Sequence, residues 1–345
     1  MIYLDCDYNN GCHPAILERL RETNDIYTGT YGFDEFSASA RDKIRSASGD
    51  PDAGVFFLAG GTQTNATVID CLLKPWQGVV AARTGHISVH EAGAVEYTGH
   101  KVFELPSEDG KIQAGALKAL LSEWHSDETR DHMAEPALVY ISFPTELGTL
   151  YAARELEEIY DVCRAFGAGL FIDGARMAYG LAADGNDVSL PFLASHCDAF
   201  YIGGTKCGAL CGEAVVFPRG NVPEKFFTRV KQHGALLAKG RLAGVQFDTL
   251  FTDGLYREIG RHADVLAVEI PRLFSKYSIG YAPTPSLTNQ QFLLVRKDAL
   301  EALAAEVSFE KWAPHDDEYD FCRFVTSWAT KRQDLEKLEE ILSKI

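Results

Sequence analysis

Short apolar runs alternate with longer amphipathic segments along the first two thirds of the chain. The runs have the length of buried strands and lie at residues 55–59, 79–82, 102–103, 138–143, 170–172, 199–202 and 214–217. Residues 64–73 have a helical pattern between two of these runs. Apolar residues at 156, 159, 160 and 163 mark one face of another helix. The alternation predicts a mostly parallel α/β sheet covered by helices.

The pattern changes near residue 245. Helices are then predicted at residues 265–273 and 300–307, strands at 291–295 and 321–326, and a closing amphipathic helix at 332–345. The chain is therefore predicted to have two domains. Residues 1–245 would form a large domain with an N-terminal arm, and residues 246–345 a smaller α+β domain.

Composition narrows the classes of function. The 345 residues are 46% apolar, enough for a large core, and the net charge of −16 argues against binding to nucleic acid or an anionic membrane. No basic and apolar leader opens the chain, and no segment approaches the ~20 apolar residues of a membrane span, so a cytoplasmic protein is expected. The eight cysteines lack CxxC spacing and are expected to be reduced thiols.

An aspartate and a lysine each follow an apolar run: Asp173 ends the run at 169–172, and Lys206 follows the run at 198–202. Ligands in parallel sheets bind where the strands end, so both side chains can face one pocket. A lysine can form an imine with an aldehyde cofactor, and an aspartate can keep a ring nitrogen protonated. Together they indicate a pyridoxal phosphate (PLP) site. Taken singly, Asp173 also fits a turn cap and Lys206 a surface lysine.

The segment 60–65, Gly-Gly-Thr-Gln-Thr-Asn, lies between a predicted strand and a predicted helix. Glycines let the backbone curl, and the free N–H groups of a helix start attract an anion. The chain has neither GxGxxG nor GxxxxGK[ST], which disfavours dinucleotides and nucleoside triphosphates. A single phosphate fits better, with a plain tight turn as the alternative.

His86 and His90 have the i, i+4 spacing of metal ligands on a helix, but the HExxH order is absent and no metal is predicted. An imidazole can instead lie on an aromatic cofactor and act as a base. The alternative is a hydrogen-bonded core histidine. Arg176 and Arg323 are candidates for a bidentate grip on a carboxylate, with surface salt bridges as the alternative.

In this combination the chain resembles the threonine aldolases of the β-eliminating lyase family. These are PLP enzymes with the aspartate aminotransferase type of fold, fold type I. The resemblance covers nearly the whole chain and is carried by residues 60–65, His86 with Glu91 and Gly93, residues 173–176, Thr205–Lys206, residues 241–244 and residues 323–326. It implies a seven-stranded, mostly parallel sheet with a smaller C-terminal domain. It also implies cleavage of L-threonine or L-allo-threonine to glycine and acetaldehyde.

The resemblance also implies roles for the cofactor-binding and catalytic residues. Lys206 would hold PLP as an imine, Asp173 would pair with the ring nitrogen, His86 would stack on the ring and serve as the base, and the phosphate would be bound by Gly61, Thr62 and Gln63. Arg176 would lie beside both cofactor and substrate. Arg241 matches a family arginine that reaches the neighbouring subunit's cofactor, so a homodimer or homotetramer is expected, with active sites near the interface.

The implied substrate contacts include departures from the family pattern. Arg176 and Arg323 would hold the carboxylate, and Cys6 stands at the position of a serine that touches the substrate in many relatives. Phe36 replaces a tyrosine, and residues 144–146 replace an amide- and histidine-containing loop. Contacts around the substrate hydroxyl are therefore expected to differ from those of relatives.

Two other functions fit the same cofactor residues. Lys206, Asp173 and the phosphate loop serve β-elimination or racemisation equally well. A non-catalytic binding module with the same fold is the second alternative.

Overall fold

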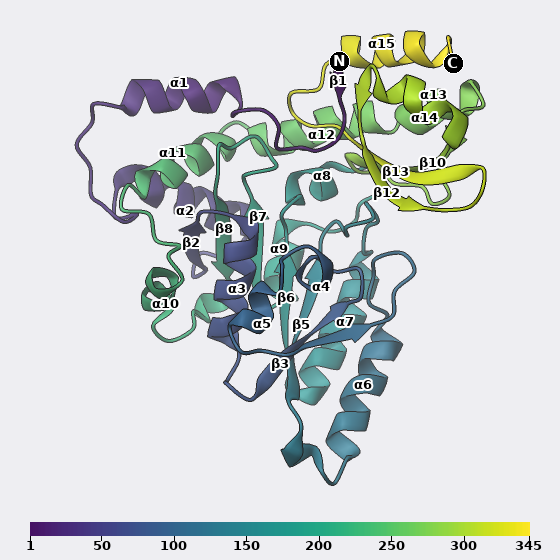
Figure 1. Cartoon of the computed structure of the whole chain (residues 1–345). Helices are drawn as coiled ribbons and strands as arrows, with labels where there is room; N and C mark the ends of the chain where they lie inside the picture. The colour runs from purple at the N-terminus through teal and green to yellow at the C-terminus, as the bar shows by residue number, and fades with distance from the viewer.

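Seven strands form one mixed sheet in the order β2-β8-β7-β6-β5-β3-β4 (Figure 1). The computed structural model describes all residues 1–345. The strands are Gly54–Leu58 (β2), Gln77–Ala82 (β3), Val102–Leu105 (β4), Glu135–Ser142 (β5), Gly169–Asp173 (β6), Ala199–Gly203 (β7) and Glu213–Phe217 (β8). Six of the strands run in one direction, and only β8 runs in the opposite direction. The predicted strands and the predicted mostly parallel sheet are confirmed.

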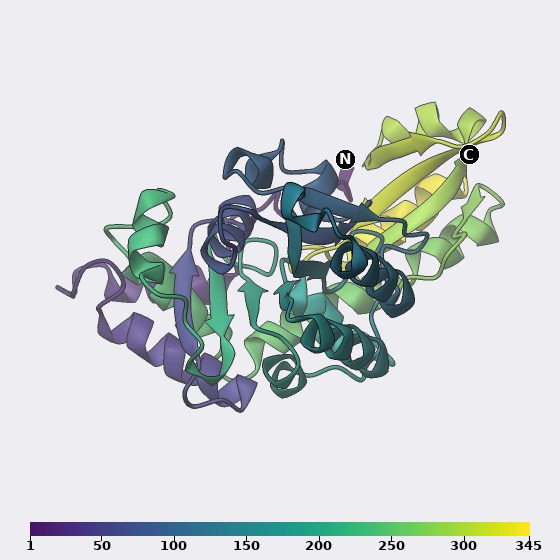
Figure 2. The same cartoon turned by 90° about the horizontal axis from the view of Figure 1, so that it is seen from below.

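Helices cover both faces of this sheet (Figure 2). One face packs against α1 (Pro14–Thr23), α2 (Glu35–Ser48), α6 (Ala114–Ser126), α7 (Ala153–Phe166), α8 (Met177–Ala182), α9 (Leu190–Ser195), α11 (Arg241–Leu250) and α12 (Leu255–Ala267). The other face packs against α3 (Gly61–Leu72), α4 (His86–Val89), α5 (Ala94–Tyr97) and α10 (Phe226–Gln232). Both faces of the sheet are therefore buried, as a parallel sheet requires. None of the helices has the length and apolar character needed to cross a membrane.

A smaller antiparallel sheet, in the order β12-β13-β10-β9, builds the C-terminal domain. Its elements are α13 (Ile270–Lys276), β9 (Gly280–Tyr281), β10 (Gln290–Arg296), α14 (Lys297–Ala304), β11 (Val307–Ser308), β12 (Glu310–Pro314), β13 (Tyr319–Val325) and α15 (Arg332–Leu342). The helix predicted at 265–273 is wrong, because α12 ends at Ala267 and a new helix begins at Ile270. Pro271 lies in the first turn of α13, where its missing N–H is tolerated. The helix predicted at 300–307 ends early, and Val307 begins a strand instead.

The N-terminal arm starts in the C-terminal domain. Strand β1 (Ile2–Tyr3) pairs in parallel with β11, and the Val325 N–H donates to the Leu4 carbonyl at 2.7 Å. Ile2 and Leu4 are buried in the core of that domain. The predicted division assigned these residues to the first domain. A two-residue strand gives no signal of its partner in the sequence, so only the folded chain shows this attachment.

All eight cysteines are free, as predicted. Cys163, Cys197, Cys207 and Cys322 are buried among apolar side chains. Burial raises the pKa of Cys163 to about 12, so this thiol stays protonated near neutral pH. The buried cysteines thus act as small apolar residues.

Candidate active site

The candidate functional side chains meet at one edge of the large sheet. Gly60 follows β2, Glu146 follows β5, Asp173 ends β6 and Lys206 follows β7. Because β8 is antiparallel, its first residue, Glu213, lies at the same edge. The carboxyl ends of parallel strands are the usual place for a ligand in such a sheet.

A cavity of about 300 Å³ opens at this edge, and we call it the lysine cavity. Its lining combines glycines, acids, one lysine and one arginine: Tyr8, Ala59, Gly60, Gly61, Thr62, His86, Ser142, Pro144, Glu146, Asp173, Ala175, Arg176, Tyr201, Thr205, Lys206, Cys211 and Glu213. The fold thus brings together Gly61, Thr62, Asp173, Arg176 and Lys206, which are distant in sequence.

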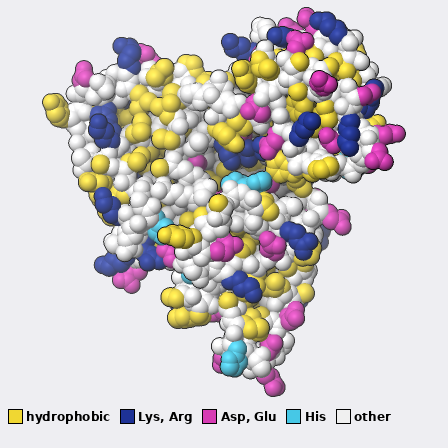
Figure 3. All heavy atoms as spheres, viewed as in Figure 1, with side chains coloured by type: hydrophobic (Ala, Val, Ile, Leu, Met, Phe, Trp, Pro, Cys, Tyr) yellow, Lys and Arg dark blue, Asp and Glu magenta, His cyan; other side chains and the backbone are white.

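A second cavity of about 240 Å³, the arginine cavity, continues toward the C-terminal domain. That domain contributes Gln290, Glu310, Trp312 and Arg323 to it. The two cavities share five lining residues, namely Tyr8, His86, Glu146, Arg176 and Lys206. Figure 3 shows the hollow between the two domains with histidine and basic side chains exposed in it. The site therefore lies between the domains.

Lys206 has no hydrogen-bond or ion-pair partner for its Nζ atom, and the Tyr8 ring lies 5.9 Å from that atom. Burial and the nearby Arg176 guanidinium lower the pKa of Lys206, although Asp7, Asp173 and Glu213 oppose this shift. A lowered pKa gives a larger fraction of neutral amine. Lys206 is thus available as a nucleophile toward an aldehyde.

Asp173 is fixed by three donors. Its carboxylate accepts hydrogen bonds from the Tyr140 hydroxyl (2.6 Å), the Asn65 amide (2.9 Å) and the Ala175 N–H (2.9 Å). Burial alone would raise the pKa of Asp173, but the His86 imidazole and hydrogen bonds from Tyr140, Tyr201 and the Ala175 N–H lower it below its usual value. The group therefore stays ionised and can face a protonated ring nitrogen.

The His86 imidazole is oriented by Glu91, with 2.7 Å between Nδ1 and Oε1. The Asn65 amide donates to the same Glu91 oxygen at 2.7 Å, so the acid is itself held in place. Nε2 of His86 makes no hydrogen bond. The ring of His90 lies 5.5 Å from those of His86 and Trp312, at the wall of the arginine cavity.

Arg176 is bound by an acid that the sequence prediction did not assign. Its Nε and Nη2 donate to the two oxygens of Asp7 at 2.7 and 3.0 Å. Asn289 also donates to Asp7, at 2.9 Å. Burial raises the pKa of Asp7, but Arg176 and Lys206 lower it below its usual value overall. Nη1 of Arg176 makes no hydrogen bond and remains available to a substrate carboxylate.

Arg323 extends from β13 into the arginine cavity. Its Nη1 donates to the Gln290 side chain at 3.2 Å, its Nη2 pairs with Glu310, and its guanidinium lies 5.0 Å from the centre of the Trp312 ring. Its Nε is buried without a partner. This arginine therefore retains an unsatisfied donor beside the cavity.

Three predicted site residues lie outside both cavities. The Gln63 amide donates to the His233 carbonyl at 3.2 Å, and the Cys6 thiol donates to Asn9 at 2.7 Å. Arg241 donates to the carbonyls of Thr23 and Ile26 at 2.5 and 2.6 Å. Within one chain, these side chains do not meet Lys206.

The sequence interpretation did not assign Tyr8 or Glu213 to the site, and it named Glu146 only as part of the loop 144–146 near the substrate hydroxyl. Glu146 lies four residues beyond the end of β5, and Glu213 begins β8. A polar residue at the edge where several predicted strands end was the available signal. It could not be used before the strand order was known.

The donor set fits PLP. Gly60 begins α3 without a side-chain cap, so the first N–H groups of this helix are free for a phosphate. An unpartnered lysine amine and an ionised aspartate lie in the same cavity. These are the three contacts that an aldehyde, a phosphate and a ring nitrogen require.

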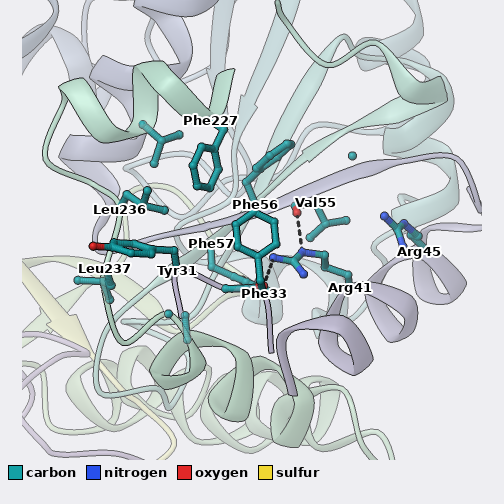
Figure 4. A pocket seen from close by; sticks show the side chains of 15 residues that line it. Tyr31, Phe33, Arg41, Arg45, Val55, Phe56, Phe57, Phe227, Leu236 and Leu237 are labelled. Carbon is teal, nitrogen blue, oxygen red and sulfur yellow. Dashed lines mark hydrogen bonds between the residues drawn. The ribbon is translucent and has the colours of Figure 1, made fainter. Parts of the chain in front are cut away.

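A third cavity, of about 230 Å³, has a different character (Figure 4). Phe33, Phe56 and Phe227 contribute their rings to its wall. Arg41 donates hydrogen bonds to the carbonyls of Gly32 (2.7 Å) and Val55 (3.1 Å). It contains no acid, histidine or lysine, and we call it the aromatic cavity.

Comparison with known proteins supports the cofactor that this donor set indicates. The family described as β-eliminating lyase matches residues 14–292. The structure of a threonine aldolase from Leishmania major superposes with a TM-score of 0.96 at 37% identity, covering 100% of this chain and 99% of that one. A low specificity L-threonine aldolase of Pseudomonas aeruginosa is 28% identical, over 98% of this chain and 95% of its own. Cystalysin from Treponema denticola, whose structure contains PLP, shares the fold with a TM-score of 0.72 at 15% identity, covering 100% and 91%.

Proposed function

Because the chain belongs to the β-eliminating lyase family, we propose that it cleaves L-threonine and L-allo-threonine to glycine and acetaldehyde. It is a PLP-dependent lyase. The observation that carries the proposed substrate class is the junction of the lysine cavity with the arginine cavity. An amino acid can be held there by its carboxylate at Arg323 while its α-carbon lies beside Lys206.

The cofactor residues have separate tasks in this proposal. When bound, PLP supplies an aldehyde for attachment and a ring that accepts the electron pair of the broken bond. Lys206 provides the attachment amine, and the start of α3 with Thr62 binds the phosphate. Asp173 holds the proton of the ring nitrogen, and His86 covers the ring.

The substrate residues orient the bond that breaks. Arg323 and the free Nη1 of Arg176 bind the carboxylate, which fixes the rotation about the α-carbon. A proton acceptor at the junction of the cavities takes the β-hydroxyl proton as the aldehyde forms.

The test is a product assay on the purified protein with added PLP. L-threonine and L-allo-threonine should each give glycine and acetaldehyde in equal amounts. Lys206→Ala should lose both this activity and the visible absorbance of bound cofactor. Ammonia and a keto acid, formed without glycine, would contradict the proposal.

The proposal includes a homodimer formed through the face that carries Arg241. Arg241 donates to the Ile26 carbonyl, and the segment 17–33 exposes the apolar side chains of Leu17, Ile26 and Phe33, with Tyr27 fully exposed at 102%. Figure 3 shows apolar side chains gathered over this part of the molecule, at the upper left. Such a patch favours association. Arg241 would then reach the cofactor of the partner subunit.

A complementation experiment tests this arrangement. Lys206→Ala and Arg241→Ala should each be nearly inactive as homodimers. Mixed dimers made by refolding the two together should regain activity, because one site then combines Lys206 of one copy with Arg241 of the other. A monomeric parent protein, or mixtures that stay inactive while both variants are dimeric, would contradict the shared site.

A further inference from the structure

The reacting atoms of a substrate must lie where the lysine and arginine cavities meet. This step rests on the proposed function, in which the cofactor is attached at Lys206 and the carboxylate is bound at Arg323. Only Tyr8, His86, Glu146, Arg176 and Lys206 line both cavities. These five residues are therefore the candidates for accepting the β-hydroxyl proton.

Three of the five are unsuited to accept this proton. Arg176 is permanently charged and bound to Asp7. Lys206 is the attachment amine. Partial burial raises the pKa of the Tyr8 phenol above its usual value, so it keeps its own proton near neutral pH. His86 and Glu146 remain.

The Glu146 carboxyl is fixed through one oxygen and free at the other. Oε1 accepts the His86 backbone N–H at 2.9 Å and the Ser142 hydroxyl at 2.5 Å. Oε2 accepts no hydrogen bond from another residue. It is also not one of the fully buried side-chain oxygens that lack a hydrogen-bond partner. The side chain is only 8% exposed. Because Glu146 lines both cavities, its side chain lies at their junction.

The position of His86 favours a different task. Its Nδ1 is engaged by Glu91, and in the proposed function its ring covers the cofactor, although its Nε2 makes no hydrogen bond. Glu146 carries no such second task. We propose that Glu146 is the catalytic residue that accepts the β-hydroxyl proton of the substrate.

The proposed proton transfer and bond cleavage balance in atoms and electrons. The β-hydroxyl proton moves to Oε2 of Glu146, and the O–H electron pair becomes the second bond of the aldehyde carbonyl. The Cα–Cβ bond breaks, and its electron pair stays with the glycine half. A proton later returns to the α-carbon of that half, so no oxidant or reductant is needed.

The surroundings of Glu146 match this task. Burial raises the pKa of Glu146 above its usual value, while the Ser142 hydroxyl and its own backbone N–H oppose the shift. A carboxylate with a raised pKa accepts a proton more readily at neutral pH. Ser142 also lies 3.3 Å from the Tyr140 hydroxyl, which donates to Asp173. Ser142 is therefore a positioning residue that links Glu146, through Tyr140, to Asp173.

Glu146→Gln tests the proposal because it keeps the shape and removes the proton acceptor. With L-threonine, kcat should fall by about 100-fold or more. The variant should keep the visible absorbance of bound cofactor and should still exchange the α-hydrogen of glycine with solvent, because neither involves a β-hydroxyl group. The acid limb of the pH–rate profile should disappear.

Ser142→Ala gives a graded check on the same carboxyl. Losing this donor raises the pKa of Glu146 further, so the acid limb should move to higher pH while kcat at its plateau falls less than in Glu146→Gln. Exposed Glu306→Gln serves as the control for a glutamate-to-glutamine change and should match the parent.

Each outcome decides a different claim. A parent that forms no glycine or aldehyde overturns the proposed function and this inference together. An active parent with an equally active Glu146→Gln, and the same acid limb, overturns only the role of Glu146. If Glu146→Gln fails to bind cofactor, Glu146→Asp decides: reduced cleavage with a displaced acid limb supports the role, and parent-like cleavage with an unchanged limb overturns it.

Discussion

At the scale of single residues, neighbours decide which acids of the site carry charge. Asp173 and Glu213 are both almost fully buried in the lysine cavity, at 4% and 3% exposure. Asp173 has its pKa lowered by His86 and by hydrogen-bond donors despite burial. Glu213 accepts the Gly204 N–H, but burial prevails and raises its pKa to about 7. The two acids therefore differ in charge near neutral pH.

Glu213→Gln should change the pH dependence of cofactor binding. Glu213 shares the lysine cavity with Gly60, Gly61 and Thr62, where the phosphate is proposed to bind. Above pH 7 its carboxylate repels the phosphate, so PLP affinity of the parent should weaken by up to about tenfold per pH unit. Absorbance titration at pH 6 and pH 8 measures the PLP affinity of both proteins. The ratio of parent to variant affinity should be lower at pH 8 than at pH 6.

The same residue affects the stability of the cofactor-free protein. An acid whose pKa is raised in the folded state stabilises that state below its unfolded pKa, near 4.5, and loses the contribution as pH rises to about 7. Urea unfolding of Glu213→Gln should lack this decline. Identical pH profiles for parent and variant, both in binding and in unfolding, would show that Glu213 stays ionised.

At the scale of elements, a glycine sets the distance between α12 and α8. A Cβ atom on Gly260 would lie 2.1 Å from the Ala178 carbonyl oxygen. Helix α8 begins directly after Arg176, so the close approach of the two helices also places this arginine. Overpacking of this kind cannot be relieved by rotating a flexible side chain.

Gly260→Ala should push the two helices apart. We expect the free energy of unfolding to fall by about 1–3 kcal/mol, measured by urea denaturation. Gly115→Ala on α6 is the matched control, because nothing lies within 4 Å of a Cβ atom there. It should be neutral or stabilising by up to about 1 kcal/mol. Equal stability of the two variants would argue against close helix contact.

At the scale of the whole molecule, the N-terminal arm joins the two domains. It begins as β1 in the C-terminal domain and ends with Asp7 bound to Arg176 of the large domain. Asn289, at the start of the small sheet, donates to the same carboxylate at 2.9 Å. One buried ion pair thus couples the position of the domains to the orientation of a predicted substrate arginine.

Asp7→Asn should destabilise the protein by about 3–5 kcal/mol, because it leaves the Arg176 charge buried without its partner. The lowered pKa of Asp7 means that its contribution is present above the unfolded pKa of about 3.8 and is lost as pH falls through the folded pKa. The stability difference between parent and variant should therefore shrink in acid. Asp5→Asn is the control, because Asp5 lies on the same arm and its side chain is hydrogen-bonded only to Asn9. A loss of stability in Asp5→Asn as large as that in Asp7→Asn would contradict this account.

The local pattern of apolar residues was sufficient to predict much of the fold. Apolar runs of strand length predicted all seven strands of the large sheet to within a few residues, because the central strands are buried on both faces and the edge strands keep apolar residues. The break between α12 and α13 was missed, because the apolar period continues across Val268 although the helix stops. Short strands such as β1 and β11 were not predicted, since two residues carry no period.

The sequence by itself determined the chemistry of the cofactor site, because Lys206, Asp173 and the glycines at 60–61 each follow a strand and need only a parallel sheet to meet. Only the tertiary structure decided which acids join them. Asp7, Glu146 and Glu213 come from the arm, a loop and an antiparallel strand, and their charge depends on burial and on partners that are distant in sequence. The cofactor could therefore be inferred from local signals, whereas the proton acceptor and the substrate contacts depend on how the two domains and the arm are packed.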